Sequence, residues 1–545
     1  MKILNYIPTK KTVLPCLFFS TLLSVTLVVG HSLYTCGTFS NIVASRQTLI
    51  SNLLTFLGYS IMFTIIFTII AVIIKKYQQT NSHKTWKIFR YPWIYSGVIF
   101  LCWLPCYLSY YPGVISYDMH DQMPQALGTI SYSKYHPPLH TFIWDICLAL
   151  GDILNLNGLV IYSILQMALL SISFTYILSF LIRKKVRNWI ILVTLLFICF
   201  NPVIAIFSFI PVKDVLFTVF FILYSVELCN FVSDKEDYAR NLFAMGRLIV
   251  FAVFSCLLRN NMVYALIVAT IFMMLFVRKY WKNILLWHAI IVLTFSIING
   301  PIYNALGIKD GDSREMLSIP IQQITYIVAH YEDSFSQEEI QQINEYLPFE
   351  DLQRLYNPRL ADYAKITFNT ENFEDNKSAF FQLWFDLFLK YPDEYIVAFL
   401  NLNLPYWYIN ANTIDEYAKR DYIETYIMES SVTNYEVVRD SKIPWLYEQY
   451  ELYAQYKFTE NTPIISAFFS ISTPIWLLLF TATVLIALKR HDCITILAPA
   501  ICYWMTFMLG PVSNLRYVFP IIALYPLYIA LTMDTPKLES RKYKK

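Results

Sequence analysis

Long apolar runs separated by short polar or basic segments make up most of the chain. A run of roughly 20 apolar residues is long enough to cross the hydrocarbon core of a bilayer as a helix. The expected spans are 13–34, 52–74, 92–109, 158–182, 189–208, 215–232, 246–259, 262–277, 283–303, 464–488, 493–510 and 516–533. The pattern therefore predicts an all-α polytopic membrane protein with about twelve transmembrane helices.

The composition agrees with this class, since 57% of the 545 residues are hydrophobic and only 15% are charged. An ordinary soluble domain is excluded. Ten cysteines are scattered, mostly within the expected spans, so a disulfide scaffold is not expected. With only 13 glycines and no nucleotide-binding fingerprint, a nucleotide site is not expected either.

Lysine and arginine clusters recur between pairs of spans, for example at Lys75–Arg90, Arg183–Arg187 and Arg278–Lys282. Short cytoplasmic loops collect such residues, so we expect both termini in the cytoplasm of a multi-pass cell-membrane protein. Basic clusters near lipid headgroups are a topology signal and imply no nucleic-acid partner. The expected layout is a two-span segment 1–91, a core 92–305 with an outer loop 110–157, an outer domain 306–465, C-terminal spans 466–533 and a basic cytoplasmic tail 534–545.

Two segments are not expected to cross the membrane. The run 139–154 would break the alternation of sides and carries Asp145 and Asp152, so it is predicted to be a juxtamembrane helix. The segment 306–465 has 27 acidic and 12 basic residues, a net charge of 12 − 27 = −15. It is expected to form a mainly helical extracytoplasmic domain.

The densest polar cluster lies in the outer loop, in YYPGVISYDMHDQMPQALGTISYSKYHPPLH at 110–140. If a helix runs from Ile115 to Gly128, Asp118, Asp121, Gln122 and Gln125 share one face, as a sugar or ion site would require. The alternative is that Asp118 only caps the helix, with Asp121 completing a weak capping box.

Three further polar intrusions fall at the outer ends of expected spans: Lys213 with Asp214, Arg259 in an apolar stretch from 248 to 277, and Arg516 in PVSNLRYVFP. A charged arginine at the centre of one helix would cost about 2.5 to 3.5 kcal/mol. We therefore expect a hairpin with Arg259 at its tip. The alternatives are an interfacial ion pair for Lys213 and a membrane anchor for Arg516.

Taken in order, the outer-loop aspartates, HPPL, Lys-Asp, Arg-Asn and RYVFP resemble the GT-C superfamily of polyprenyl-phosphate-sugar glycosyltransferases over about 92–533. Within it the chain is most similar to Gram-positive membrane proteins, and more distantly to protein O-mannosyltransferases and lipid A aminoarabinose transferases. The resemblance implies a GT-C-like helical bundle with its active site facing outside.

The resemblance also implies an undecaprenyl-phosphate-linked sugar as donor and an extracytoplasmic acceptor such as a cell-wall polysaccharide or teichoic acid. Asp118 is then the expected general base and Asp121 its helper. Lys213, Arg259 and Arg516 are expected to bind the donor phosphate. The residues expected to shape the substrate site are Gln122, Gln125, His136, His140 and Tyr517.

Two questions stay open at this point. Asp118, His120, Asp121 and His136 are potential ligands of a divalent metal, although no cofactor is required by the pattern. A polysaccharide polymerase, or a lipid-linked saccharide transporter or flippase, is the alternative function. Transporters commonly place charge in a central cavity between repeated halves, a pattern that this chain lacks.

Overall fold

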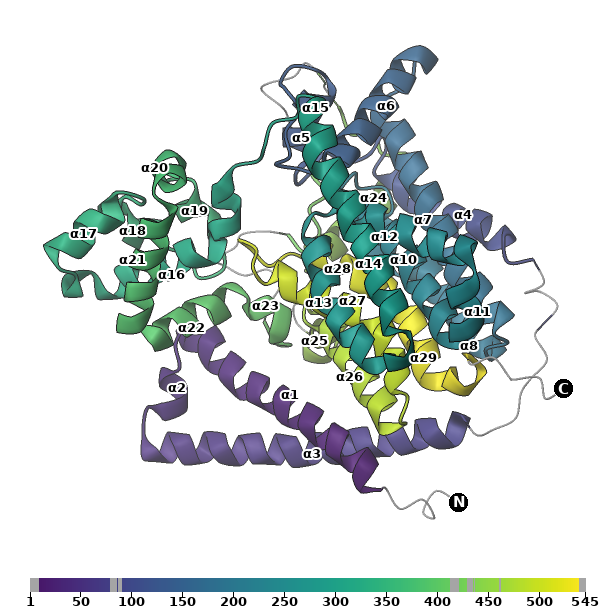
Figure 1. Cartoon of the computed structure of the whole chain (residues 1–545), viewed down its shortest axis with the longest axis horizontal. Coiled ribbons are helices and arrows are strands. Elements are labelled where there is room, and N and C mark those ends of the chain that lie inside the picture. The colour runs from purple at the N-terminus through teal and green to yellow at the C-terminus, as the bar shows by residue number, and fades with distance from the viewer. Residues whose placement is uncertain are drawn as a thin grey trace.

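Helices form almost the whole of the computed structural model, which describes residues 9–78, 86, 91–411, 421–428, 435, 437–459 and 462–538. Within these residues the only β pairing consists of three isolated bridges. Figure 1 shows a bundle of helices, a pair of long N-terminal helices that crosses below it, and a group of short helices beside it. The all-α class predicted from the apolar runs is confirmed.

Six described helices are long and apolar enough to cross a membrane: α1 (Lys10–Cys36), α3 (Arg46–Gln78), α7 (Gly158–Arg183), α10 (Lys213–Ser233), the segment Arg278–Ala305 that contains α14 (Trp281–Ile297), and the segment Leu515–Met533 that contains α28 (Leu515–Ala523). Five shorter apolar helices are α4 (Ile94–Ser109), α8 (Asn188–Phe200), α12 (Leu242–Leu258), α13 (Asn261–Phe276) and α26 (Thr473–Ala487). The chain is therefore a multi-pass membrane protein.

Several expected spans are interrupted rather than continuous. The run 189–208 divides into α8 and α9 (Pro202–Phe207), because Asn201 caps the second helix and Pro202 has no N–H to donate. The run 464–488 divides into α25 (Pro463–Phe469) and α26. The run 516–533 likewise breaks between α28 and α29 (Tyr525–Leu538). Hydropathy alone does not show these breaks.

Helix α10 is the centre of the bundle and packs against α7, α12, α27 (Ile494–Phe507) and α28. Nearly all of its side chains are buried, which explains why its sequence is apolar on every face. Lys213 and Asp214 lie in its first turn, so their position is fixed by a helix that is buried along most of its length.

The segment between α15 (Tyr303–Ala305) and α23 (Leu404–Trp407) contains a second hydrophobic core. Helix α16 (Ser318–Tyr331) lies at its centre and packs against α18 (Phe349–Leu355), α19 (Asp362–Lys365) and α22 (Pro392–Leu402). In Figure 1 these helices stand apart from the bundle. Described residues that follow, among them Tyr422, Ile423, Tyr453 and Tyr456, belong instead to the core of the bundle. The acidic segment thus contributes to two different cores.

Two local predictions near the polar cluster concern helices. Residues 138–154 form one helix, α6 (Pro138–Leu154), which packs against α7, whereas its place at the membrane surface stays a prediction. The apolar stretch around Arg259 is a hairpin, since α12 ends at Leu258 and α13 begins at Asn261. Arg259 is thereby held at the end of two helices.

Candidate active site

Asp118 precedes the short helix α5 (Met119–Ala126) and follows a residue in an unusual conformation. Tyr117 has φ of 56°, in the left-handed region that non-glycine residues rarely adopt. The backbone N–H of Glu424 donates to the Tyr117 hydroxyl at 2.8 Å, and Ser116 donates to the Glu424 carbonyl at 2.8 Å. These contacts with the acidic segment hold the turn that directs Asp118 toward the bundle.

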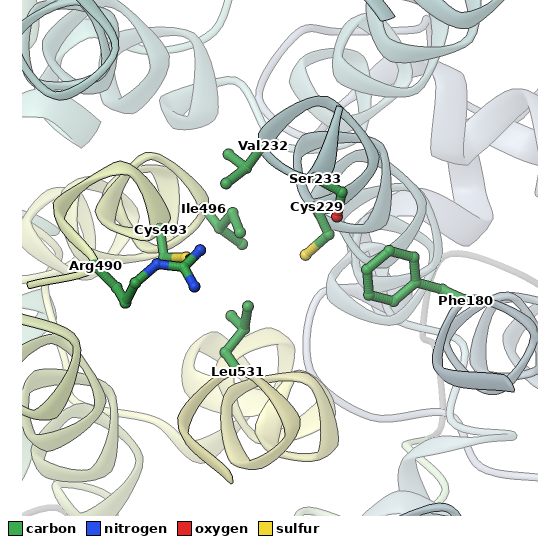
Figure 2. A pocket seen from close by; sticks show the side chains of 8 residues that line it. All are labelled: Phe180, Cys229, Val232, Ser233, Arg490, Cys493, Ile496 and Leu531. Carbon is green, nitrogen blue, oxygen red and sulfur yellow. The ribbon is translucent and has the colours of Figure 1, made fainter. Parts of the chain in front are cut away.

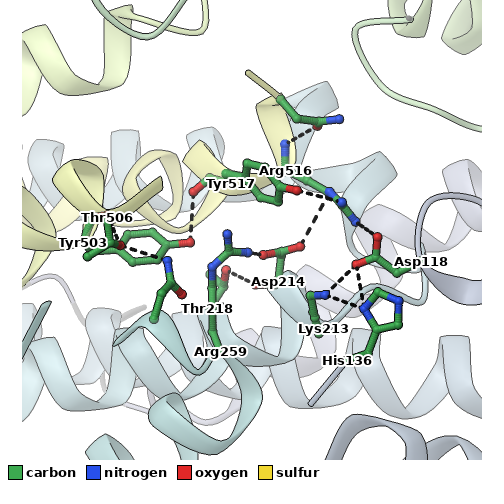
Figure 3. A network of polar contacts seen from close by, with 12 residues as sticks. Asp118, His136, Lys213, Asp214, Thr218, Arg259, Tyr503, Thr506, Arg516 and Tyr517 are labelled. Carbon is green, nitrogen blue, oxygen red and sulfur yellow. Dashed lines mark hydrogen bonds and ion pairs between the residues drawn. The ribbon is translucent and has the colours of Figure 1, made fainter. Parts of the chain in front are cut away.

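Two cations from distant elements hold the Asp118 carboxylate (Figure 3). Arg516 Nη1 lies 2.9 Å from Oδ1, and Lys213 Nζ lies 2.6 Å from Oδ2. Burial alone would raise the pKa of Asp118, but Arg516 and Lys213 outweigh it and hold the pKa well below its usual range. Asp118 is therefore ionised at neutral pH, and its carboxylate is a weak base while both cations contact it.

A second ion pair adjoins the first. Asp214 is fully buried and is paired with Arg259 from the tip of the α12–α13 hairpin. Arg516 Nε lies 4.0 Å from Asp214 Oδ2, so its guanidinium stands between Asp118 and Asp214. Charges of opposite sign thus alternate from Lys213 through Asp118, Arg516 and Asp214 to Arg259.

His136 extends the cluster toward Asp121. Its Nδ1 lies 3.0 Å from Lys213 Nζ and its Nε2 lies 3.3 Å from Asp121 Oδ2. An ammonium group can only donate, so Nδ1 accepts and Nε2 carries the proton that is donated to Asp121. Burial and the nearby Lys213 lower the pKa of His136, in agreement with a neutral ring. The Asp121 side chain is 42% exposed and marks the solvent edge of the cluster.

Tyrosine rings cover the two guanidinium groups. Arg516 lies 4.7 Å from the ring centre of Tyr117 and 4.8 Å from that of Tyr517. Arg259 lies 4.5 Å from the ring centre of Tyr517, and Arg516 also donates to the Tyr517 hydroxyl at 2.9 Å. Tyr517 therefore orients both arginines through cation–π contacts and a hydrogen bond.

The buried charges of the cluster balance. Three cations, Lys213, Arg259 and Arg516, face the carboxylates of Asp118 and Asp214, and the buried carboxylate of Glu424 also acts on Arg516, which gives 3 − 3 = 0 with a neutral His136. Asp121 adds a negative charge at the exposed edge. Guanidinium groups near buried carboxylates are suited to an additional anionic ligand, such as a phosphate, that can share their donors.

Three expected site residues lie elsewhere. The predicted helix from Ile115 to Gly128 is too long, because α5 begins only at Met119. Gln122 contacts Thr141 and His140, and Gln125 binds the backbone of Asp121 and Ser133, so both amides support the loop. These contacts leave no shared polar face.

His140 is buried and bound to Gln122 at 2.9 Å and to Tyr162 at 2.7 Å. It belongs to the packing of α6 on α7 rather than to the cluster around Asp118. The alternative role of Asp118 as a helix cap is also wrong, since its side chain makes no capping hydrogen bond.

A metal site receives no support from the described side chains. Among them, no three histidine, cysteine, aspartate or glutamate residues are placed as metal ligands would be. The side chain of His120 lies outside the described part of the structure.

Comparison with known proteins shows the family to which the sequence belongs. The model described as "Family of unknown function (DUF6020)" matches residues 131–545, which is most of the chain. The chain belongs to this family. The matched range contains Lys213, Asp214, Arg259 and Arg516 of the cluster, and it begins after Asp118. No curated protein and no solved structure matches the chain.

A small cavity elsewhere in the protein is too small to be a substrate site. It is lined by Cys229, Cys493, Arg490 and five apolar or small neighbours (Figure 2). Its volume of about 10 Å³ is close to the space of one water molecule. Neither a sugar nor a lipid fits there.

Reasoning from the sequence missed three residues of the cluster. Asp214 received no role beside Lys213, and the alternative interpretation of the two as an ion pair is wrong, because each residue pairs with a different partner. Tyr117 and Tyr503 were not distinguished from the many interface tyrosines, although Tyr503 lies 5.5 Å from Arg259. Asp214 and Tyr117 are sequence neighbours of Lys213 and Asp118, which had been selected for their charge, so their position could have indicated them. Tyr503 packs on Arg259 only in the fold.

Proposed function

We propose that the cluster around Asp118 binds the phosphate of a polyprenyl-linked sugar and transfers the sugar to an extracytoplasmic acceptor. The observation that carries the proposal is the pairing of Asp118 with both Arg516 and Lys213 at one end of the bundle. A carboxylate beside two phosphate-binding cations is what sugar transfer from a lipid phosphate requires. The resemblance to GT-C glycosyltransferases supports the same reaction, with undecaprenyl phosphate as carrier.

The ion pairs suggest how such a reaction proceeds. A donor phosphate accepts hydrogen bonds from Arg516 and Lys213 and so competes with Asp118 for them. Asp118 then becomes more basic and takes the proton of the acceptor hydroxyl. The acceptor oxygen bonds to the anomeric carbon, the bond from that carbon to the phosphate oxygen breaks, and the phosphate leaves with the electron pair. Arg259 and Arg516 stabilise its charge.

The electrostatics of the cluster's solvent edge favour a neutral acceptor. Burial raises the pKa of Tyr135, and the carboxylates of Glu315, Asp121, Asp118 and Asp362 raise it further, which shows that several acidic groups converge there. The adjoining segment 306–465 has a net charge of −15, from 12 basic and 27 acidic residues. A polyanion such as teichoic acid would be repelled, so we favour an uncharged wall polysaccharide as acceptor.

The test begins with the donor, because its chemistry is specified better than that of the acceptor. Binding of undecaprenyl phosphate to the purified protein is measured by native mass spectrometry. Arg516→Ala is expected to weaken the binding of undecaprenyl phosphate about 10- to 150-fold, because one charge-assisted hydrogen bond contributes about 1.5 to 3 kcal/mol. Arg516→Lys is expected to retain part of the affinity. Arg354→Ala, at an arginine that is 74% exposed on α18, is the matched control.

Transfer of labelled sugar from undecaprenyl phosphate to isolated wall glycan is then measured with the same variants. Unchanged donor binding and transfer in well-folded Arg516→Ala protein would contradict the proposal. Native protein that moves lipid-linked saccharide across the vesicle membrane without transferring the sugar would favour the transporter.

A further inference from the structure

A basic cavity lies at the end of the bundle where α1, α3 and α26 meet. Its volume is about 520 Å³, and it is formed by the first turn of α1, the end of α3 and the residues that follow α26. Four of the eight residues that line it are lysines: Lys10, Lys11, Lys75 and Lys489. None of the other described lining residues is acidic. Figure 1 shows α26 reaching the pair α1 and α3 at this end.

Such a cavity attracts an anion for two reasons. Several ammonium groups share one space, so a bound anion relieves their mutual repulsion. The cavity also includes the N-terminus of α1, where Thr9 provides no side-chain cap for the first-turn N–H groups. These N–H groups and the helix dipole add to the positive potential of the lysines.

An apolar groove continues from the basic cavity along α1 and α26. It has a volume of about 590 Å³ and lies between α1 and α26. Leu14, Phe18 and Leu22 form one wall, and Leu479 and Ala482 belong to the other. From Lys11 to Leu22 the helix rises about 16 Å, close to half of the roughly 30 Å hydrocarbon core. The groove therefore has the length of one lipid leaflet.

We propose that this cavity and groove together bind an anionic phospholipid, with the phosphate among the lysines and an acyl chain between α1 and α26. The preference of lysine for cytoplasmic loops would explain basic residues at these helix ends, but not their convergence on a groove. A free phosphate would use the cavity without the groove. The site is separate from the cluster around Asp118, so it does not depend on the proposed function.

Native mass spectrometry of the full chain with phosphatidylglycerol and phosphatidylcholine of identical acyl chains tests the proposal. Phosphatidylglycerol is expected to bind about tenfold or more tightly, since each lysine near an anionic headgroup contributes about 1 kcal/mol. The triple variant Lys10→Gln, Lys11→Gln, Lys489→Gln should remove this preference. The matched control removes three charges at Arg278, Lys279 and Lys282, which do not line the cavity.

A second variant tests the groove without changing charge. Ala482→Phe places a ring between α1 and α26 and should weaken the long-chain lipid while leaving binding of glycerol phosphate unchanged. Equal loss of phosphatidylglycerol in the two triple variants would overturn the proposal, because the lysines would then act only as general surface charge. Equal binding of both lipids by the native chain, or unchanged lipid binding in Ala482→Phe, would overturn it as well.

Discussion

The pairing of Asp118 with Arg516 predicts a measurable coupling in stability, independent of any substrate. We consider Asp118→Asn, Arg516→Gln and the double variant at pH 7.5. Removing one partner of a buried ion pair costs about 3 to 5 kcal/mol, because the other charge is left without compensation. The exposed fractions of the two side chains, 18% for Asp118 and 7% for Arg516, reduce this value toward its lower limit.

The two single variants are expected to differ. Arg516→Gln leaves Asp118 paired with Lys213 at 2.6 Å, whereas Asp118→Asn removes the ion-pair partner of both Arg516 and Lys213 and leaves Arg516 with Asp214 at 4.0 Å and the charge of Glu424. Asp118→Asn should therefore be the more destabilising change. In the double variant neither Asp118 nor Arg516 remains as an uncompensated charge, although Lys213 still lacks a carboxylate, so the loss should be smaller than the sum of the two by about 1 to 3 kcal/mol.

Denaturant-induced unfolding in mixed micelles, followed by tryptophan fluorescence, provides the four free energies of unfolding. A second cycle that combines Asp118→Asn with Arg354→Gln, at an exposed arginine of α18, is the control and should be additive within about 0.5 kcal/mol. If the Asp118 and Arg516 changes are equally additive, the two groups do not form a pair and the geometry of the site is wrong. Any loss of sugar transfer in Asp118→Asn has to be corrected for the measured unfolding.

Further predictions concern single residues. Burial lowers the pKa of His140 from 6.5 to about 3, so below pH 6.5 the unfolded state binds a proton that the folded state does not, and the protein loses stability as the pH falls. Between pH 7.5 and 5.5 this loss amounts to about 1.4 kcal/mol, and the His140→Gln variant should not show it in the same unfolding measurement. Tyr517→Phe deletes one hydrogen bond to Arg516 and should weaken undecaprenyl-phosphate binding about threefold to tenfold, as native mass spectrometry can measure. In intact cells that express the protein without its exposed Cys36, a cysteine introduced by Glu350→Cys should react with an impermeant thiol reagent, whereas one introduced by Arg183→Cys should not. The reverse labelling pattern would mean that the topology is inverted.

The sequence predicted the elements of the site better than their details. Lys213, Arg259 and Arg516 each interrupt an apolar run, and a buried charge is so costly that such interruptions must meet partners in the fold. The structure indeed brings them together with Asp118, although the catalytic roles remain predictions. The hairpin at Arg259 followed from the same argument.

The sequence could not show which polar side chains of the outer loop face the cluster. A helical face is reliable only if the helix begins where it is expected, and here α5 begins after Asp118. Gln122 and Gln125 thus point to loop contacts that depend on the position of α6 and of the loop backbone. The broken spans at Asn201 and beyond α28 were missed for a related reason, since apolar composition does not distinguish one helix from two.

The alternating order of charges has a consequence for the biosynthesis of the chain. Asp118 precedes Arg516 by 516 − 118 = 398 residues, and Asp214 precedes it by 516 − 214 = 302 residues. Until α28 is inserted, Asp118 has only Lys213 and Asp214 only Arg259 as a cationic partner. Helix α28 thus completes the charge compensation that the earlier helices require. A polypeptide truncated before Leu515 would keep most of its apolar helices, while Asp118 and Asp214 would both lack the guanidinium of Arg516.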